Sequence, residues 1–137
     1  MYEIEQSVGF LLSKAYKKGF SIFREQLLPY NITPPQFSIL AFLWREDGLS
    51  QTELCERSQV DRATMVGLVD RLEDEGLVKR HNHVGDRRAY RVCLTEKGRA
   101  LEKPASDIAE KVLKEFTSKL TEKEINTLRD ILNKLRR

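Results

Sequence analysis

The stretch SQTELCERSQVDRATMVGLVDRLEDEG, residues 50–76, decides the fold of this chain. It holds start and stop signals for two short helices. Ser50 and Glu53 have the spacing of a capping box, in which the serine hydroxyl accepts a backbone N–H and the carboxylate reaches back. Asp61 suits the N-cap of a second helix, and Gly76 suits its end. Two short helices joined by a tight turn predict a helix-turn-helix.

A hairpin is predicted directly after these two helices. Residues 77–83 read as one strand, and residues from about 88 to 94 read as its partner because apolar and polar side chains alternate there. Gly85 and Asp86 between the strands are turn formers, since glycine tolerates positive φ and aspartate can bond its own backbone. Helices followed by a hairpin predict a mainly α fold with a small β-hairpin wing, a winged helix-turn-helix.

Further helices are predicted on both sides of this unit. Residues 3–28 carry a wide apolar stripe, which indicates more than one neighbour. A second helix begins at Thr33, its N-cap. After the hairpin, one helix begins at Thr95 and bends near Pro104, and the last helix begins at Thr121. That last helix carries a seam like that of a coiled coil, formed by Ile125, Leu128, Leu132 and Leu135 and widened by Ile131.

The stripe of residues 3–28 and the seam of the last helix together offer more apolar surface than one small winged helix can cover. Exposed patches of this kind usually mark an interface. The alternative is that the stripe and the seam both pack within one subunit.

Length and composition describe an ordinary single domain. The chain has 137 residues, 33% of them charged and 40% hydrophobic, and a formal net charge of +3. This charge is too small to indicate a nucleic-acid partner by itself, so its distribution matters more. No apolar run is long enough to span a membrane, and the N-terminus lacks the pattern of a secretory signal. Cys55 and Cys93 have no motif spacing, so a cytoplasmic protein with free thiols is expected.

Four segments, in this order and spacing, resemble the MarR family of winged helix-turn-helix transcription regulators: residues 60–66 (VDRATMV), 72–80 (LEDEGLVKR), 86–88 (DRR) and 94–98 (LTEKG). The resemblance covers the whole chain as one domain, residues 1–137. It implies a winged helix-turn-helix over about 33–95 and dimerisation helices over about 3–28 and 96–136. It also implies a homodimer that binds double-stranded DNA at a pseudo-palindromic operator, more often as a repressor.

The second helix of the helix-turn-helix is the expected recognition helix. Its periodicity turns Met65, Leu68, Val69 and Leu72 inward. The set facing the groove is then Arg62, Ala63, Thr64, Val66 and Gly67, with Arg71 further along. Arg62 could bond guanine, Thr64 a phosphate or a base, and Val66 a thymine methyl group. The alternatives are a solvated Arg62 and, for Arg71, an ion pair with Asp74 or Glu75.

Gly67 departs from the longer polar side chain that regulators of this family often carry nearby. A glycine in this place weakens the helix by roughly 1 kcal/mol relative to alanine. A close approach of the DNA backbone is a physical reason to keep it.

The wing carries lopsided charge. Residues 79–91 contain five basic side chains and one acidic side chain, Asp86. A guanidinium on a narrow stalk suits the minor groove, where the potential is most negative. The resemblance implies that Asp86 holds Arg88 by a charge-assisted bond while Arg88 enters the groove, and that Arg87 lies along phosphates. The alternative is a solvated turn whose charges only aid solubility.

Regulators of this family often respond to small aromatic or phenolic anions. If this chain does so, the candidate lining residues are Tyr16, Phe20, Phe23, Arg24 and Trp44. The alternative is that these aromatic residues belong to the core, which is their commoner role at helical spacing.

Other site types have weaker support in the sequence. His81 and His83 share one strand face, which could be half of a metal site, but no local Cys or Glu completes it, so neither a metal nor a cofactor is expected. Cys93 is more readily a small structural residue than a reactive thiol. No catalytic triad or phosphate loop is present, so the chain is not expected to be an enzyme. The main alternative to DNA binding is a winged helix that contacts only proteins.

Overall fold

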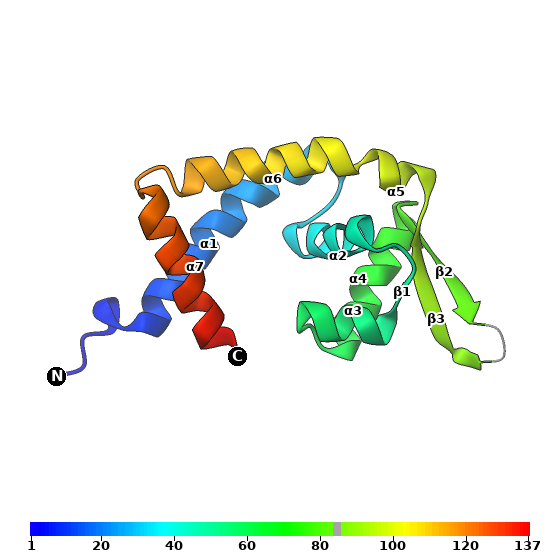
Figure 1. The fold of residues 1–137 in the computed structure, drawn as a ribbon, viewed down its shortest axis with the longest axis horizontal. Helices are drawn as coiled ribbons and strands as arrows, with labels where there is room; N and C mark the ends of the chain where they lie inside the picture. The colour runs from blue at the N-terminus through cyan, green and yellow to red at the C-terminus, as the bar shows by residue number, and fades with distance from the viewer. Residues whose placement is uncertain (84–85) are drawn as a thin grey trace.

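The computed structural model of the chain describes residues 1–83 and 86–137, and of residues 83 and 86–89 it describes the backbone alone. Two 3-10 turns, seven α-helices and three strands follow one another in these residues (Figure 1). In chain order they are η1 (Ile4–Gln6), α1 (Val8–Leu27), η2 (Leu28–Tyr30), α2 (Pro34–Arg45), β1 (Leu49–Ser50), α3 (Gln51–Ser58), α4 (Arg62–Asp74), β2 (Val78–His83), β3 (Asp86–Leu94), α5 (Glu96–Ala100), α6 (Glu102–Phe116) and α7 (Glu122–Arg136).

The predicted helix-turn-helix is confirmed as α3 and α4, with the predicted caps. The Ser50 hydroxyl accepts the Glu53 N–H at 3.1 Å, and the Glu53 carboxylate accepts the Ser50 N–H at 3.2 Å. Asp61 accepts the Thr64 N–H at 2.8 Å at the start of α4. Gly76 has a φ of 71°, which lets the chain leave α4 and enter the wing. Polar side chains therefore set the starts of both helices.

A third strand joins the hairpin, and the sequence analysis did not predict it. β1 pairs antiparallel with β3, with Leu49 opposite Val92, so the strand order is β1-β3-β2. A strand of two residues is too short to show an alternating pattern. β3 also begins at Asp86 rather than near residue 88. The wing is thus part of a small three-stranded sheet in which β3 lies between β1 and β2.

Two predicted helices differ in their limits. The first begins at Val8 rather than residue 3, because Ser7 caps it by accepting the Phe10 N–H at 3.3 Å. The predicted bend near Pro104 lies instead at Leu101, between α5 and α6. A proline ring clashes with the carbonyl four residues earlier, so the earlier helix ends at Ala100 and Pro104 sits in the first turn of α6.

The core lies in the winged helix-turn-helix. The four residues predicted to face inward from the recognition helix are all buried there. They pack with buried residues of α1, α2, α3 and the sheet, among them Leu27, Ile39, Leu40, Leu43, Leu49, Leu54, Leu77 and Val92. This packing holds α4 against the sheet.

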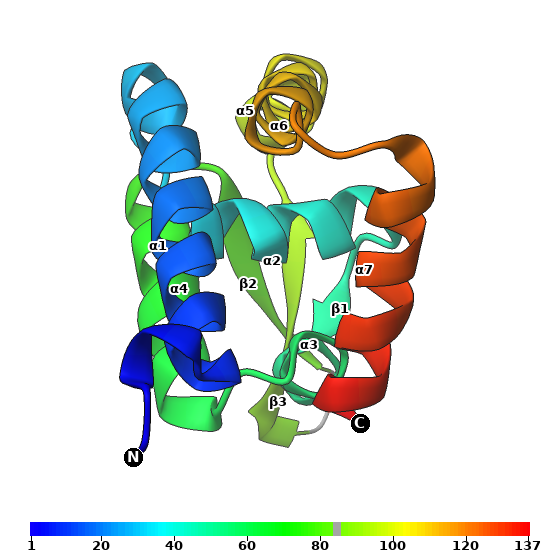
Figure 2. The same ribbon diagram turned by 90° about the vertical axis from the view of Figure 1, so that its left-hand side faces the viewer.

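α6 connects the winged helix-turn-helix at one end of the molecule with α1 and α7 at the other (Figure 1). Seen along α6, α1 and α7 lie on opposite sides of the molecule (Figure 2). Large apolar side chains remain exposed on η1, α1, α6 and α7: Ile4, Val8, Leu11, Leu12, Tyr16, Leu113, Phe116, Leu128, Ile131, Leu132 and Leu135. No helix in the described part of the chain is long and apolar enough to cross a membrane.

Candidate nucleic-acid interface

The outer face of α4 carries the residues predicted to read DNA. Arg62, Ala63, Thr64, Val66 and Arg71 are exposed, while Gly67 is half-buried. Among the described residues, Arg71 forms no ion pair with Asp74 or Glu75 on its own helix. The first two turns of α4 thus present an open surface with a guanidinium at its N-terminal end.

Asp70 also lies on this face, and the sequence analysis overlooked it. It follows Val66 by four residues, so the two side chains stand one above the other on the helix. A carboxylate facing DNA would repel phosphates unless a cation neutralises it. The spacing of Arg62, Val66 and Asp70 was the signal that could have pointed to this residue.

Thr64 has a structural task besides any contact with DNA. Its backbone N–H and its hydroxyl both donate to the Asp61 carboxylate, at 2.8 and 2.9 Å. These two hydrogen bonds lower the pKa of Asp61, so the cap stays ionised. The Thr64 hydroxyl keeps its acceptor lone pairs for an outside partner.

Among the described residues, none packs closely against Gly67. A Cβ built on it would have nothing within 4 Å. Packing among the described residues therefore does not explain the glycine.

Some basic side chains of the wing are bonded within the chain, and others are exposed. Arg91 donates to the Gly48 carbonyl at 2.9 Å, and Arg80 pairs with carboxylates of α4, so neither guanidinium is simply displayed to solvent. Lys79 is exposed. The side chains of Asp86, Arg87 and Arg88, to which the sequence analysis assigned the minor groove, lie outside the described residues. Arg80, one of the five basic residues counted over residues 79–91, is thus held by partners on α4.

Arg80 stays charged in this environment. Burial would lower the pKa of its guanidinium, but hydrogen bonds to Asp70, Tyr90 and Glu73 outweigh burial and raise that pKa. The Arg80 backbone N–H also donates to the Glu73 carboxylate at 3.0 Å. Side chain and backbone of β2 are thus both tied to α4.

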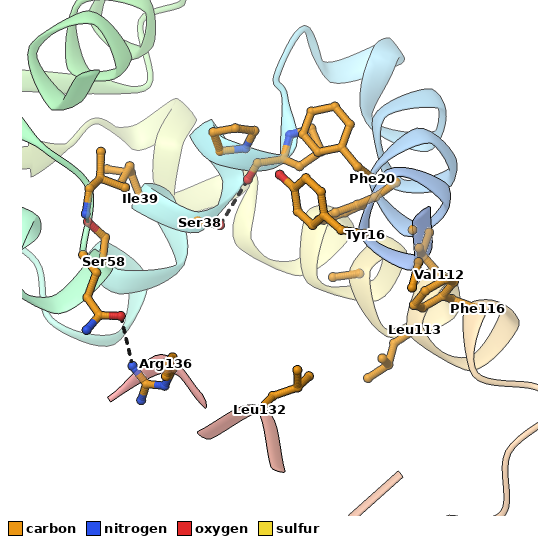
Figure 3. Close-up of a pocket in the computed structure, with 18 of the residues that line it drawn as sticks. Tyr16, Phe20, Ser38, Ile39, Ser58, Val112, Leu113, Phe116, Leu132 and Arg136 are labelled. Carbon is orange, nitrogen blue, oxygen red and sulfur yellow. Dashed lines mark hydrogen bonds between the residues drawn. The ribbon is translucent and has the colours of Figure 1, made fainter. Parts of the chain in front are cut away.

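A large cavity of about 1130 Å³ lies between α1, α2, α6, α7 and the turn that joins α3 to α4 (Figure 3). Tyr16, Phe20 and Phe23, which were predicted to line a ligand site, line this cavity. Arg57 and Arg136 also line the cavity, and Arg57 is paired with the Glu46 carboxylate at 2.7 Å. Arg136 donates to the Gln59 side chain at 3.4 Å.

Two residues assigned to the ligand site lie elsewhere. The Trp44 ring packs edge-on against Phe37, with ring centroids 5.6 Å apart, and its indole N–H donates to the Gly98 carbonyl at 2.9 Å. Arg24 is exposed on α1 and does not line the cavity. Trp44 thus joins α2 to α5, which is the core role left open in the sequence analysis.

The surroundings of the two cysteines do not point to a reactive thiol. Burial and the neighbouring Asp47 carboxylate raise the pKa of the Cys93 thiol, against the smaller effects of Arg91 and Arg99. A raised pKa lowers the thiolate fraction and therefore the reactivity. Cys55 is half-buried.

Comparisons with known proteins agree with this geometry. The MarR family model matches residues 32–90. The HTH-type transcriptional repressor NicR of Pseudomonas putida is 41% identical over 100 residues, which cover 73% of this chain and 63% of NicR. The organic hydroperoxide resistance transcriptional regulator of Bacillus subtilis is 30% identical over 111 residues, which cover 81% of this chain and 76% of that regulator.

Solved structures of similar proteins superpose on nearly the whole chain. BpsR of Bordetella bronchiseptica, whose DNA binding is regulated by 6-hydroxynicotinic acid, superposes with a TM-score of 0.92 at 28% identity over 99% of this chain and 97% of BpsR. A cysteine-to-serine mutant of MarR from E. coli, complexed with operator DNA, superposes with a TM-score of 0.86 at 29% identity over 93% of this chain and 92% of that chain. From matched sequence, shared fold and an open recognition helix, it follows that the chain belongs to the MarR family, whose members are transcription regulators and not enzymes.

Proposed function

We propose that this chain is a ligand-responsive repressor that binds a pseudo-palindromic operator as a homodimer. The observation that carries the proposal is the open outer face of α4, which lies beside a projecting sheet and is backed by a buried apolar face. Two such helices would enter successive major grooves about 34 Å apart, and two wings would reach the flanking minor grooves. The E. coli relative solved with operator DNA supports the same use of the fold.

Base reading would come from the N-terminal half of α4. Arg62 can donate two hydrogen bonds to guanine O6 and N7, and Val66 can contact a thymine methyl group. Thr64 and Arg71 would bond phosphates or base edges. Ala63 and Gly67 carry no side chain long enough to keep the helix away from the groove floor.

The wing would supply the minor-groove contact. In this proposal Arg88 enters the groove, Asp86 orients it, and Arg87 lies along phosphates. The excess of basic residues over residues 79–91 supports the assignment, even though Arg80 and Arg91 have partners within the chain.

The homodimer would form through α1, α6 and α7. The apolar seam of α7 is open to solvent in the single chain, with Leu128 41% exposed, Leu132 39% exposed and Leu135 59% exposed. Exposure of Val8 and Leu11 on α1 extends the apolar surface. A second copy that covers both helices would bury these side chains, and at about 25 cal/mol per Å² of apolar area this favours association.

A small aromatic or phenolic anion is the proposed ligand, and the cavity beneath α6 is its proposed site. Tyr16 and Phe20 offer flat apolar contacts, and Arg136, whose hydrogen-bond partner is the neutral Gln59 side chain, offers a charge for a carboxylate or phenolate. The regulation of BpsR by 6-hydroxynicotinic acid supports this class of ligand. The ligand would favour a dimer geometry whose recognition helices no longer match the groove spacing, by no more than its differential affinity for the two states.

The central test is a fluorescence-anisotropy titration against the DNA directly upstream of the protein's own gene, with an unrelated duplex of equal length as control. Tight binding that prefers the upstream DNA is expected. Equal affinity for the two duplexes would argue against a specific operator at this locus. No binding to either duplex at low salt would favour a winged helix that contacts only proteins.

The ligand is tested by thermal shift against a panel of hydroxylated aromatic carboxylates. A ligand of this class should raise the melting temperature in proportion to ln(1 + [L]/Kd) and release the operator. Arg136→Gln should weaken both effects, whereas Arg24→Gln, outside the cavity, serves as the matched control. No shift with any member of the panel would contradict the proposed ligand class.

A further inference from the structure

One guanidinium joins the wing to the recognition helix. Arg80 of β2 is bonded to the Asp70 carboxylate at 2.7 Å and to the Glu73 carboxylate. It also donates to the Val66 carbonyl at 3.3 Å. Val66 and Asp70 belong to the DNA-facing side of α4, so Arg80 contacts the helix at the edge of that surface.

The contact continues across the sheet to the start of α3. The Arg80 guanidinium carbon lies 5.2 Å from the centroid of the Tyr90 ring on β3. Arg80 is paired with Val92, so Tyr90 is its diagonal neighbour on the same face. The Tyr90 hydroxyl donates to the side chain of Gln51, the first residue of α3. α3, both long strands and α4 thus meet through two side chains of the wing.

Arg80 is poorly suited to bind DNA itself. Its side chain is only 20% exposed, and two carboxylates already occupy the donors of its planar fork. A phosphate would have to displace Asp70 or Glu73 and leave a carboxylate uncompensated beside the DNA. The pairing instead cancels the negative charge of Asp70 on the outer face of α4.

The wing needs such a tie because its sheet is small. β1 supports β3 only through Leu49 and Ser50, and β2 is an edge strand that pairs with β3 alone. β2 continues for three residues beyond Arg80, about 10 Å at the usual rise of a strand. A small rotation of the hairpin at Arg80 would therefore become a displacement of the tip that is large compared with a groove contact.

We propose that Arg80 is a positioning residue, which fixes the wing against the recognition helix so that one rigid unit meets the major and minor grooves together. This rests on the proposed DNA contact of the wing. Asp70 and Glu73 serve the same task from α4, and Tyr90 transmits it to α3. Specific affinity then depends on the geometry of the fork and not on the positive charge of Arg80.

Arg80→Lys is the first test, because it keeps the charge and removes the fork. Lysine can reach one carboxylate but cannot bond Asp70, Glu73 and the Val66 carbonyl together. Affinity for the operator should fall about tenfold, while affinity for an unrelated duplex stays within about twofold of the wild-type value. Wild-type operator affinity, or an equal loss on both duplexes, would overturn the proposal.

Asp70→Asn should change operator affinity in opposite directions for the two roles that Arg80 could have, positioning the wing or binding phosphate. If Arg80 positions the wing, loss of the ion pair weakens operator binding; if Arg80 binds phosphate, its release strengthens binding. Asp74→Asn removes the same charge from an exposed residue of α4 and provides the electrostatic baseline. Operator affinity of Asp70→Asn should fall at least about threefold below that of Asp74→Asn. An affinity equal to or above the baseline would contradict the positioning role.

A double-mutant cycle separates failure of this inference from failure of the wing contact. Arg88→Ala alone tests whether the wing binds DNA. If Arg80 acts by placing the wing, the losses caused by Arg80→Lys and Arg88→Ala should be strongly less than additive. Additive losses would show that Arg80 acts independently of the wing and would overturn the positioning role while leaving the wing contact intact. Should Arg80→Lys prevent folding, Asp70→Asn, at an exposed side chain, replaces it in the cycle.

Discussion

At the scale of single residues, two glycines of this chain have different surroundings. Gly98 is buried where α5 passes the end of α4, and a Cβ there would collide with the Leu77 backbone carbonyl. That carbonyl already accepts the Thr95 N–H at 3.1 Å. Gly67 stands in open space. The first glycine is required by packing within the chain, and the second is not.

Gly98→Ala should therefore destabilise the fold. The clash is with backbone, which cannot rotate away, so the free energy of unfolding should fall by about 3 kcal/mol. Urea denaturation followed by circular dichroism measures the change. Gly9→Ala, in a helix and without neighbours within 4 Å, is the matched control and should not destabilise the chain. Equal stability of the two variants would refute the close approach at Gly98.

Gly67→Ala should raise stability and lower function. Alanine favours the helix by roughly 1 kcal/mol, so the melting temperature should increase. The added methyl group would stand on the DNA-facing side of α4, and operator affinity should fall. Thermal melting and anisotropy titration on the same sample separate the two effects. Unchanged affinity would mean that DNA does not approach this residue closely.

Arg88→Ala should weaken operator binding without harming the fold. We expect a loss of at least about tenfold, the usual value for an arginine that reaches into a groove. Dimerisation and melting temperature should stay unchanged. Lys119→Ala, which removes one positive charge far along the chain from the wing, controls for net charge. A large fall in melting temperature would instead assign Arg88 a structural role.

At the scale of elements, α7 is the helix whose sequence and environment disagree most in the single chain. It has a capping box at Thr121 and Glu124 and an apolar seam, yet none of its residues is buried. A helix with this seam is normally covered. The mismatch is the physical basis for expecting a second copy over it.

Leu128→Asp should dissociate the homodimer and abolish operator binding, because a carboxylate in an apolar interface loses its hydration. Sedimentation velocity measures the oligomeric state. Asn126→Asp adds the same charge on the opposite side of α7 and should leave the dimer intact. Dissociation by both variants would indicate a general charge effect and not a specific seam.

At the scale of the whole molecule, α6 spans from the winged helix-turn-helix to α1 and α7, and the large cavity opens between these parts (Figures 1 and 3). A change in packing at the cavity therefore acts on the junction between the proposed dimer helices and the DNA-facing unit. Ligand, dimer and DNA would be coupled through this junction by differential affinity alone.

Operator binding by the whole dimer should depend steeply on salt. Six or more phosphate contacts would release enough counterions to lower the affinity by about three orders of magnitude between 50 and 200 mM salt. Anisotropy titrations at four salt concentrations give the slope, and Arg87→Ala should reduce it by about one unit for each wing that loses a phosphate contact. A flat salt profile would contradict phosphate binding.

The sequence by itself determined the helix-turn-helix, the buried face of α4 and the wing. These features depend on short-range rules: Ser50 and Asp61 cap the helices next to them, and the spacing of Met65, Leu68 and Val69 follows one helix face. The first helix was also predicted, but its start was placed at residue 3 because the cap at Ser7 was not recognised.

Only the tertiary structure decided which side chains are free to act. Arg80 and Trp44 looked like members of a basic wing and of a ligand site, but residues distant in the chain hold both of them. The short strand β1 and the exposed place of Asp70 beside Arg80 likewise depend on long-range pairing. The sequence shows how many guanidinium groups a segment carries. Which groups they bind depends on elements that come together only when the chain folds.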